Sequence, residues 1–315
     1  MALSPAPFFT DVCPGPDGGA AFWADTADGV RIRLGLWPCP NAKGTVLLLP
    51  GRTEYIEKYG ASATELAKRG FSTLCIDWRG QGLADRLLTD ARIGHVESFE
   101  DYQRDMAAML DAAMTLDLPK PFYLLAHSMG GCIGLRALLQ DLPVQAAAFT
   151  GPMWGIRIAP LLVPPAYLLS CLMPAIGLGH GLPPQTSYEA YVLANPFQDN
   201  LLTSDMRMYD MMRDQLLAHP ELALGGPSYV WLAQALTETN DLARHAAPNI
   251  RCATYLGSDE QIVSVPRIHQ RMAGWKNGQL DVIKGGAHEV LMEGPDITDP
   301  LFEDIARFFV DAKSD

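Results

Sequence analysis

A short stretch of the sequence, residues 122–131 (FYLLAHSMGG), places a serine where an apolar strand turns into a helix. A sharp strand-to-helix turn of this kind exposes a serine hydroxyl, and it needs small residues two positions to either side. Ala126 and Gly130 occupy those positions around Ser128. We therefore predict that Ser128 is the nucleophile of an acyl-transfer reaction, with a simple helix cap as the alternative.

A nucleophilic serine needs a base to take its proton and an acid to orient that base. In this arrangement the chain order is serine, acid, histidine. His288 follows the last expected strand in a Gly-Gly-Ala loop, and catalytic groups collect at such carboxyl ends of strands. We predict His288 as the base. The acid is expected in the loop after the preceding strand, where Asp259 and Glu260 are neighbours and both stay open.

The charged oxygen of the transition state needs two N–H donors. The residue after the nucleophile, Met129, supplies one of them. The loop at residues 48–60 supplies the other, since Gly51 allows close approach of the backbone and the next amide belongs to Arg52. We predict an oxyanion hole formed by the Arg52 and Met129 N–H groups, and we expect the Arg52 side chain to be a solvated cation.

The elements that position these residues alternate along the chain. Short apolar runs are separated by helical patterns, which indicates an α/β fold with a mostly parallel central sheet flanked by helices. The expected strands cover residues 30–37, 45–50, 71–77, 121–127, 144–151, 250–257 and 280–285.

The alternation predicts how the chain is divided. Residues 1–29, rich in Gly, Pro and Ala, are expected to be an N-terminal arm. Residues 30–151 and 248–315 are expected to form the core. Residues 152–247 are helical in pattern, rich in Pro and Met, and are predicted to be a lid inserted between core strands.

The insertion suggests what the protein binds. Met153, Trp154, Leu161 and Leu168 are our candidates for substrate binding, with packing of the insertion onto the core as the alternative. Residues 159–182 are nearly uncharged and long enough to span a bilayer, but repeated prolines and glycines interrupt them. We expect a hydrophobic lid that contacts a membrane surface transiently, and no spanning helix.

Charge and cysteine usage narrow the partners and the location. The net charge is −12 and no Lys/Arg run is present, which excludes simple electrostatic binding to nucleic acid or to anionic membranes. Six scattered cysteines without a Cys-x-x-Cys pair, and a start that lacks a signal-peptide pattern, favour the cytoplasm. The scattered His and Cys residues show no metal-ligand spacing, so no metal or organic cofactor is expected.

Five motifs in order carry a family resemblance. The stretches LLPGRTEYIEKYG, IDWRGQGLADR, LLAHSMGG, LGSDEQIV and GAHEVLMEG resemble the lysophospholipase and monoacylglycerol-lipase-like branch of the α/β-hydrolase superfamily. The resemblance extends from residue 30 to the C-terminus. It implies Ser128 as nucleophile and His288 as base. In such proteins the acid stands three residues after a glycine and two before an Ile/Val pair, which implies Glu260, with Asp259 as the alternative.

The sequence departs from that branch at two positions. Pro50 stands where relatives often carry histidine before the oxyanion glycine, and Gln81 stands where they often carry the histidine of Arg-Gly-His-Gly. These departures bear on substrate preference. Glu54 matches a recurring acidic position and is expected to brace the oxyanion loop, with a surface ion pair as the alternative.

Together these features predict hydrolysis of a small-molecule carboxylic ester with an apolar or lipid-like acyl group. Two alternatives stay open. An amidase or aminopeptidase would need acidic residues gathered for a substrate amine, and the candidates are Glu189, Asp199, Asp205 and Asp210. A catalytically silent binding protein is disfavoured because serine, acid and histidine are all present.

Overall fold

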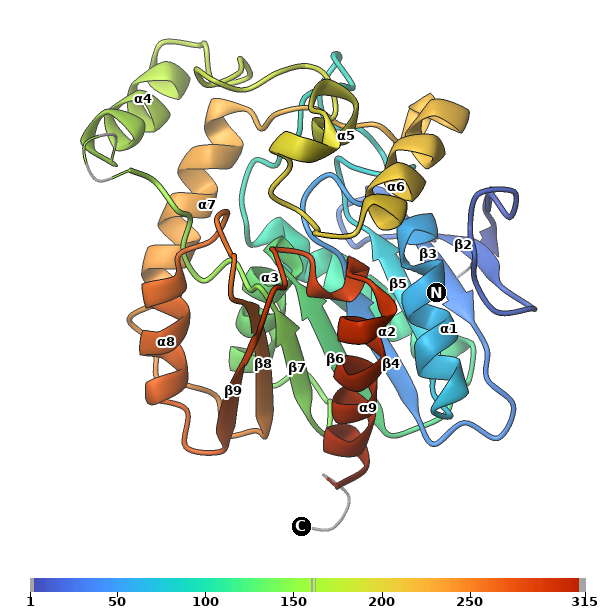
Figure 1. Cartoon of the computed structure of the whole chain (residues 1–315). Helices are drawn as coiled ribbons and strands as arrows, with labels where there is room; N and C mark the ends of the chain where they lie inside the picture. The colour runs from blue at the N-terminus through green and yellow to red at the C-terminus, as the bar shows by residue number, and fades with distance from the viewer. Residues whose placement is uncertain (1–2, 160, 162, 312–315) are drawn as a thin grey trace.

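The computed structural model describes residues 3–159, 161 and 163–311. Helices cover both faces of a central sheet whose strand order is β1-β2-β3-β5-β4-β6-β7-β8-β9, which confirms the predicted fold class (Figure 1). The strands are β1 (Ser4–Pro5), β2 (Ala20–Asp25), β3 (Arg31–Trp37), β4 (Thr45–Leu49), β5 (Ser72–Asp77), β6 (Phe122–His127), β7 (Ala147–Thr150), β8 (Cys252–Gly257) and β9 (Gly278–Ile283).

The helices follow the predicted alternation. Those of the core are η1 (Ile56–Tyr59), α1 (Gly60–Lys68), α2 (Asp101–Thr115), α3 (Met129–Leu139), α8 (Val265–Ala273), η5 (Val290–Met292) and α9 (Pro295–Asp311). Those between β7 and β8 are α4 (Val163–Ala175), α5 (Tyr191–Ala194), η3 (Phe197–Asp199), α6 (Met206–Ala218), η4 (Pro220–Leu222) and α7 (Tyr229–Leu242).

The strands from β4 onward run parallel to one another. The apolar runs of β4 to β8 are buried on both faces, whereas the edge strand β9 is partly exposed. In β4, Val46 and Leu48 pack toward α1 and α9, whereas Leu47 and Leu49 pack toward α2 and α3. Two hydrophobic cores therefore sandwich the sheet. Burial on both faces explains why these strands are continuous apolar runs rather than alternating ones.

The expected N-terminal arm differs from the prediction. Within residues 3–29, β1 and β2 extend the sheet, because β2 pairs antiparallel with β3 from Ala20–Leu36 to Asp25–Arg31. Only Ala21 and Ala24 of β2 are buried, so small side chains carry the packing of this strand. The Gly- and Pro-rich composition of this segment masked a strand that depends on its partner.

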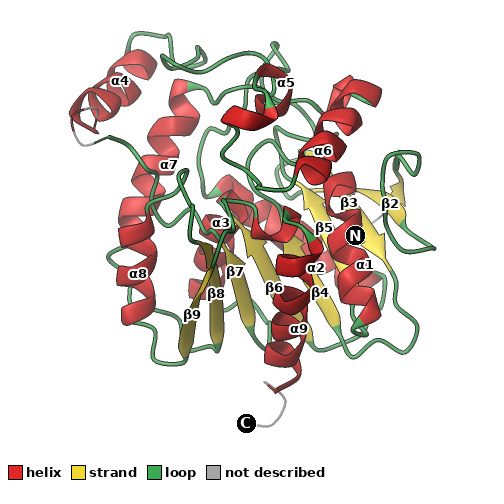
Figure 2. Ribbon diagram, in the orientation of Figure 1, coloured by secondary structure: helices red, strands yellow, loops and turns green. Residues whose placement is uncertain are grey.

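The helices between β7 and β8 lie at one end of the sheet, over the loops that follow the strands (Figures 1 and 2). Of these, α4 projects furthest and packs mainly on α7. No helix in the described part of the chain has the length and apolar character that crossing a membrane requires.

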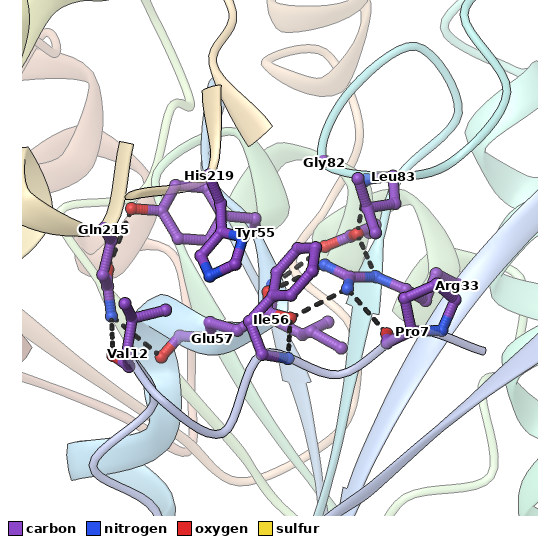
Figure 3. A network of polar contacts seen from close by, with 12 residues as sticks. Pro7, Val12, Arg33, Tyr55, Ile56, Glu57, Gly82, Leu83, Gln215 and His219 are labelled. Carbon is purple, nitrogen blue, oxygen red and sulfur yellow. Dashed lines mark hydrogen bonds and ion pairs between the residues drawn. The ribbon is translucent and has the colours of Figure 1, made fainter. Parts of the chain in front are cut away.

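A buried arginine ties the N-terminal segment to the core (Figure 3). The Arg33 guanidinium donates two hydrogen bonds of 2.8 Å to the Glu57 carboxylate and one of 2.7 Å to Asp77. A further N–H group donates to the Pro7 carbonyl at 3.0 Å. All three charged side chains are fully buried. Gly82 packs directly against this network and has no room for a side chain, because a Cβ there would lie 2.2 Å from the Asp77 carboxyl carbon.

The same network reaches the insertion (Figure 3). The Tyr55 hydroxyl bonds to the Gln215 side chain of α6 at 2.8 Å, and the Gln215 amide donates to the Val12 carbonyl at 2.8 Å. The N-terminal segment, the loop after β4 and α6 are thus held together at one place.

Replacing Arg33 with methionine tests this tie. The Arg33→Met change leaves two buried carboxylates without a cation, so we expect the free energy of unfolding in urea to fall by about 3–5 kcal/mol. Arg31→Met is the matched control, since Arg31 lies on the same strand in a half-exposed pair with Asp85, and it should cost about 1 kcal/mol or less. Equal losses in the two variants would contradict this assignment.

Candidate active site

The turn between β6 and α3 holds Ser128 in a left-handed conformation, with φ of 51°. The Ser128 N–H donates to the Thr150 carbonyl at 3.1 Å, which ties the turn to β7. Gly130 is required, because a Cβ there would lie 2.3 Å from the Leu49 carbonyl oxygen. Ala126 is tolerated in place of glycine since its methyl group faces Gly134 of α3, which has no side chain.

Ser128, His288 and Glu260 form a continuous hydrogen-bond chain. The His288 Nε2 atom lies 2.9 Å from the Ser128 hydroxyl, and His288 Nδ1 lies 2.6 Å from a Glu260 carboxylate oxygen. All three residues are buried. The sequence-predicted serine, base and preferred acid are therefore brought together in hydrogen-bond contact.

The other oxygen of Glu260 accepts backbone N–H groups from Ile262 at 2.6 Å and Val263 at 3.0 Å. Burial alone would raise the pKa of Glu260, but its contact with His288 and these two amides hold the pKa below the ordinary value. The neighbouring Asp259 is exposed and contacts Ser258 instead. The Ile-Val pair thus supplies the amides that orient the glutamate.

Gly151 is a site residue that the sequence reasoning missed. It follows β7 with φ of +47°, and a Cβ there would lie 3.0 Å from the His288 carbonyl oxygen and 3.2 Å from the Glu260 carboxylate. The glycine therefore leaves room for the contact between acid and histidine. Its sequence signal is its place directly after a strand and before the insertion.

The loop after β4 passes close to the nucleophile, since a Cβ on Gly51 would lie 3.1 Å from Ser128 Cβ. The Glu54 carboxylate accepts the Gly51 N–H, so Glu54 braces this loop. Gln81 braces it from the other side, donating to the Gly51 carbonyl at 2.8 Å and accepting the Thr53 N–H at 3.3 Å. Gln81 therefore holds the loop whose Arg52 amide was predicted to face the oxyanion.

A buried ion-pair network joins that loop to the histidine loop. The Lys58 ammonium lies 2.7 Å from Glu54 and 2.7 Å from Glu289, the residue after His288. Burial would raise the pKa of Glu54, but the Lys58 charge holds it at about 2. Burial lowers the pKa of the adjacent His127 to about 4. Glu54, His127 and Glu289 have metal-ligand atoms within 4.8 Å of one another, but the Lys58 ammonium already pairs with both carboxylates.

A cavity of about 390 Å³ opens onto these residues. Ser128, His288 and Arg52 line it together with Lys58 and its two partner carboxylates. Its remaining wall is largely apolar and comes from the loops after the strands and from the insertion: Tyr55, Met153, Ile156, Ala190, Tyr191, Val192, Leu201, Leu202, Met212, Leu216, Pro227, Trp231, Leu232, Ile262 and Val263.

Of the four predicted substrate-binding residues, Met153 lines the cavity and the other three do not. Trp154 is buried in the core, where it stacks on Trp275 at 6.1 Å between ring centroids and donates to the Gly131 carbonyl. Leu161 is 90% exposed and Leu168 is 64% exposed. The region around α4 is apolar on all sides, so sequence periodicity could not distinguish its inner face from its outer face.

The Arg52 side chain also differs from the expectation of a solvated cation. Arg52 lines the cavity, and its guanidinium donates to the Gly225 carbonyl at 2.9 Å and lies 5.6 Å from the ring centroid of Trp231, which also lines the cavity. Burial lowers its pKa to about 10, so the group keeps its charge at neutral pH. The sequence contained no local signal for this, because Gly225 and Trp231 come from the insertion.

The chain is similar in sequence to known hydrolases. Residues 40–295 match the family described as serine aminopeptidase, S33. The chain is 29% identical over 303 residues to lysophospholipase L2 of Escherichia coli strain K12. The aligned region covers 90% of this chain and 85% of that protein. It is 29% identical over 124 residues, 39% of this chain and 45% of that protein, to phospholipase YtpA of Bacillus subtilis.

Solved structures share the fold at low sequence identity. A monoglyceride lipase of Saccharomyces cerevisiae superposes with a TM-score of 0.69 at 18% identity, covering 92% of this chain and 94% of that one. A carboxyl esterase of Bacillus coagulans superposes with a TM-score of 0.73 at 14% identity, covering 94% and 99%. Both support the α/β-hydrolase fold.

Gly151→Ala tests the space between acid and histidine. The added methyl group must displace His288 or Glu260 by a few tenths of an ångström, so we expect Ser128 to react with a fluorophosphonate at least about tenfold more slowly, since small misplacements of catalytic groups cost rate steeply. Gly285→Ala is the control, because Gly285 also has a positive φ but nothing within 4 Å. It should share the backbone cost of about 1–2 kcal/mol and react at the wild-type rate. Equal rates in the two variants would contradict a spatial role for Gly151.

Proposed function

The chain belongs to the serine aminopeptidase S33 family, and from this premise we propose that it is a serine hydrolase that cleaves carboxylic esters through an acyl-enzyme. The observation that carries the proposal is the buried hydrogen-bond chain from Ser128 through His288 to Glu260. A carboxylate, an imidazole and a hydroxyl in this order activate the hydroxyl for attack on an acyl carbon.

The mechanism uses these groups in turn. His288, oriented by the Glu260 carboxylate, takes the Ser128 proton while the serine oxygen attacks the ester carbonyl carbon. The Arg52 and Met129 N–H groups stabilise the oxyanion. His288 then donates the proton to the departing alcohol, leaving an acyl-enzyme. Water repeats the sequence with His288 as base, and the carboxylic acid leaves Ser128.

The cavity favours an apolar or lipid-like acyl group. Its wall is mostly Leu, Ile, Val, Met and aromatic side chains, among which Met212 and Leu216 come from α6. An acyl chain buried there gains about 0.8 kcal/mol per CH₂ group. Relatives named lysophospholipase and monoglyceride lipase support the same class of small-molecule ester.

An aminopeptidase activity is the less favoured alternative. It would need free carboxylates beside the nucleophile to bind a substrate amine. The two carboxylates that line the cavity, Glu54 and Glu289, are already paired with Lys58. The candidates Glu189, Asp199, Asp205 and Asp210 are absent from the described wall of the cavity.

The insertion, residues 152–247, is proposed to act as a lid on the core formed by residues 30–151 and 248–315. Apolar side chains around α4 are exposed and support transient contact with a membrane surface by apolar contact rather than charge: Leu161, Val163, Leu168, Leu172, Ile176 and Leu178. Nucleic acid is not an expected partner of a chain with net charge −12. A cytoplasmic location is proposed from the cysteine pattern.

A fluorophosphonate probe tests the nucleophile directly. We expect one covalent adduct per folded chain, located on Ser128 by peptide mass, because the activated hydroxyl attacks phosphorus as it attacks an acyl carbon. Ser128→Ala should abolish both the adduct and the hydrolysis of p-nitrophenyl esters. An adduct on another residue, or no adduct on folded protein, would contradict the proposal.

Exchanging each neighbouring carboxylate for its amide tests the acid. Glu260→Gln keeps the shape but removes the charge that orients His288, so kcat on a short p-nitrophenyl ester should fall on the order of 10⁴-fold. Asp259→Asn is the matched control at an exposed position, and it should keep the wild-type kcat. If only Asp259→Asn lost activity, the acid would be Asp259.

A further inference from the structure

Arg52 is a cation that lines the cavity. One N–H group donates to the Gly225 carbonyl, and the ring of Trp231 lies beneath the guanidinium. No carboxylate among the described residues forms an ion pair with it. A guanidinium has five N–H donors, so most of its hydrogen-bonding capacity is available to a ligand.

Three other buried cations among the described residues are each paired with two carboxylates. Arg33 lies between two carboxylates, and so do Arg79 and Lys58. Arg86, which also contacts the insertion, instead donates to the carbonyl oxygens of four residues. An uncompensated buried charge costs free energy. Arg52 differs from Arg86 in lining the cavity of Ser128 and His288, where a bound anion would compensate its charge.

The position of this charge relates it to the reaction. Arg52 lines the same cavity as Ser128 and His288. Its own amide is the proposed oxyanion donor, so the guanidinium lies within one side-chain length of the scissile ester. The carboxylates of the cavity, Glu54 and Glu289, are held by Lys58 in the network beside His288, whereas the guanidinium contacts the start of α7.

We propose that the Arg52 guanidinium binds a phosphodiester headgroup joined to the ester by a short glycerol linker, and thereby selects lipids with a phosphate over neutral glycerides. This inference rests on the proposed ester hydrolysis and names the alcohol side of its substrate. The planar fork of arginine matches two phosphate oxygens with parallel charge-assisted hydrogen bonds. The apolar wall takes the acyl chain, so the two ends of one substrate meet different chemistry within one cavity.

The test compares two esters that share the same decanoyl chain. One is a lysophosphatidylglycerol and the other is the monoacylglycerol, assayed in the same neutral detergent. For the wild type we expect kcat/KM to be at least tenfold higher for the phosphate ester. In Arg52→Gln this ratio should fall by tenfold or more, mainly through KM. If the substitution displaces the Arg52 amide, both esters should lose activity equally. Such a common loss cancels in the ratio of the two kcat/KM values.

Two further variants separate charge from structure. Arg52→Lys keeps a cation without the fork and should restore part of the ratio. Arg86→Gln removes a second arginine that joins core to insertion through backbone carbonyls, but it lies outside the described cavity wall. It should leave the ratio at the wild-type value.

An unchanged ratio in Arg52→Gln would overturn the headgroup proposal and leave the side chain as a tie to Gly225. A second result would also overturn the headgroup proposal: inorganic phosphate below 1 mM stabilises the wild type against heat, but the enzyme shows no preference between the two esters. The guanidinium would then be a site for a free anion. Failure of the proposed function itself is distinguishable, since then neither ester is cleaved and Ser128 takes no fluorophosphonate.

Discussion

The left-handed turn at Ser128 is the constraint on which the site depends. A non-glycine residue with φ of 51° costs free energy, and such strain persists only where the surroundings hold it. Here the Ser128 N–H is bonded to β7, and the start of α3 is pressed against the backbone after β4 at Gly130. The contact that enforces the turn therefore also brings Gly51, in the loop that carries Arg52, close to Ser128.

Buried charges hold the loops around this turn in register. Lys58 of η1 joins Glu54, in the loop after β4, to the residue next to His288. Arg33 of β3 joins η1 to β5 and to the N-terminal segment. Hydrophobic packing is not directional, whereas a paired charge fixes both distance and orientation. Loops without regular secondary structure are thus positioned by ion pairs, while the sheet is stabilised by its two apolar cores.

The features predictable from sequence were those with local causes. Short unbroken apolar runs located the parallel strands, and the small residues around Ser128 located the turn. The spacing of Glu260 before the Ile-Val pair also has a local cause, since those two amides bind its carboxylate. The rest depends on partners distant in sequence. Trp154 is apolar, as a residue of the cavity wall would be, but it stacks on Trp275 in the core.

The two positions at which the sequence departs from the family pattern, Pro50 and Gln81, both take part in holding the oxyanion loop. The oxyanion loop is held through its backbone: Trp78 donates to the Pro50 carbonyl, Gln81 binds the Gly51 carbonyl, and Glu54 binds the Gly51 amide. A loop fixed in this way does not need the side chain of its next residue for support. Arg52 can therefore offer its amide to the reacting oxygen while its guanidinium faces the cavity.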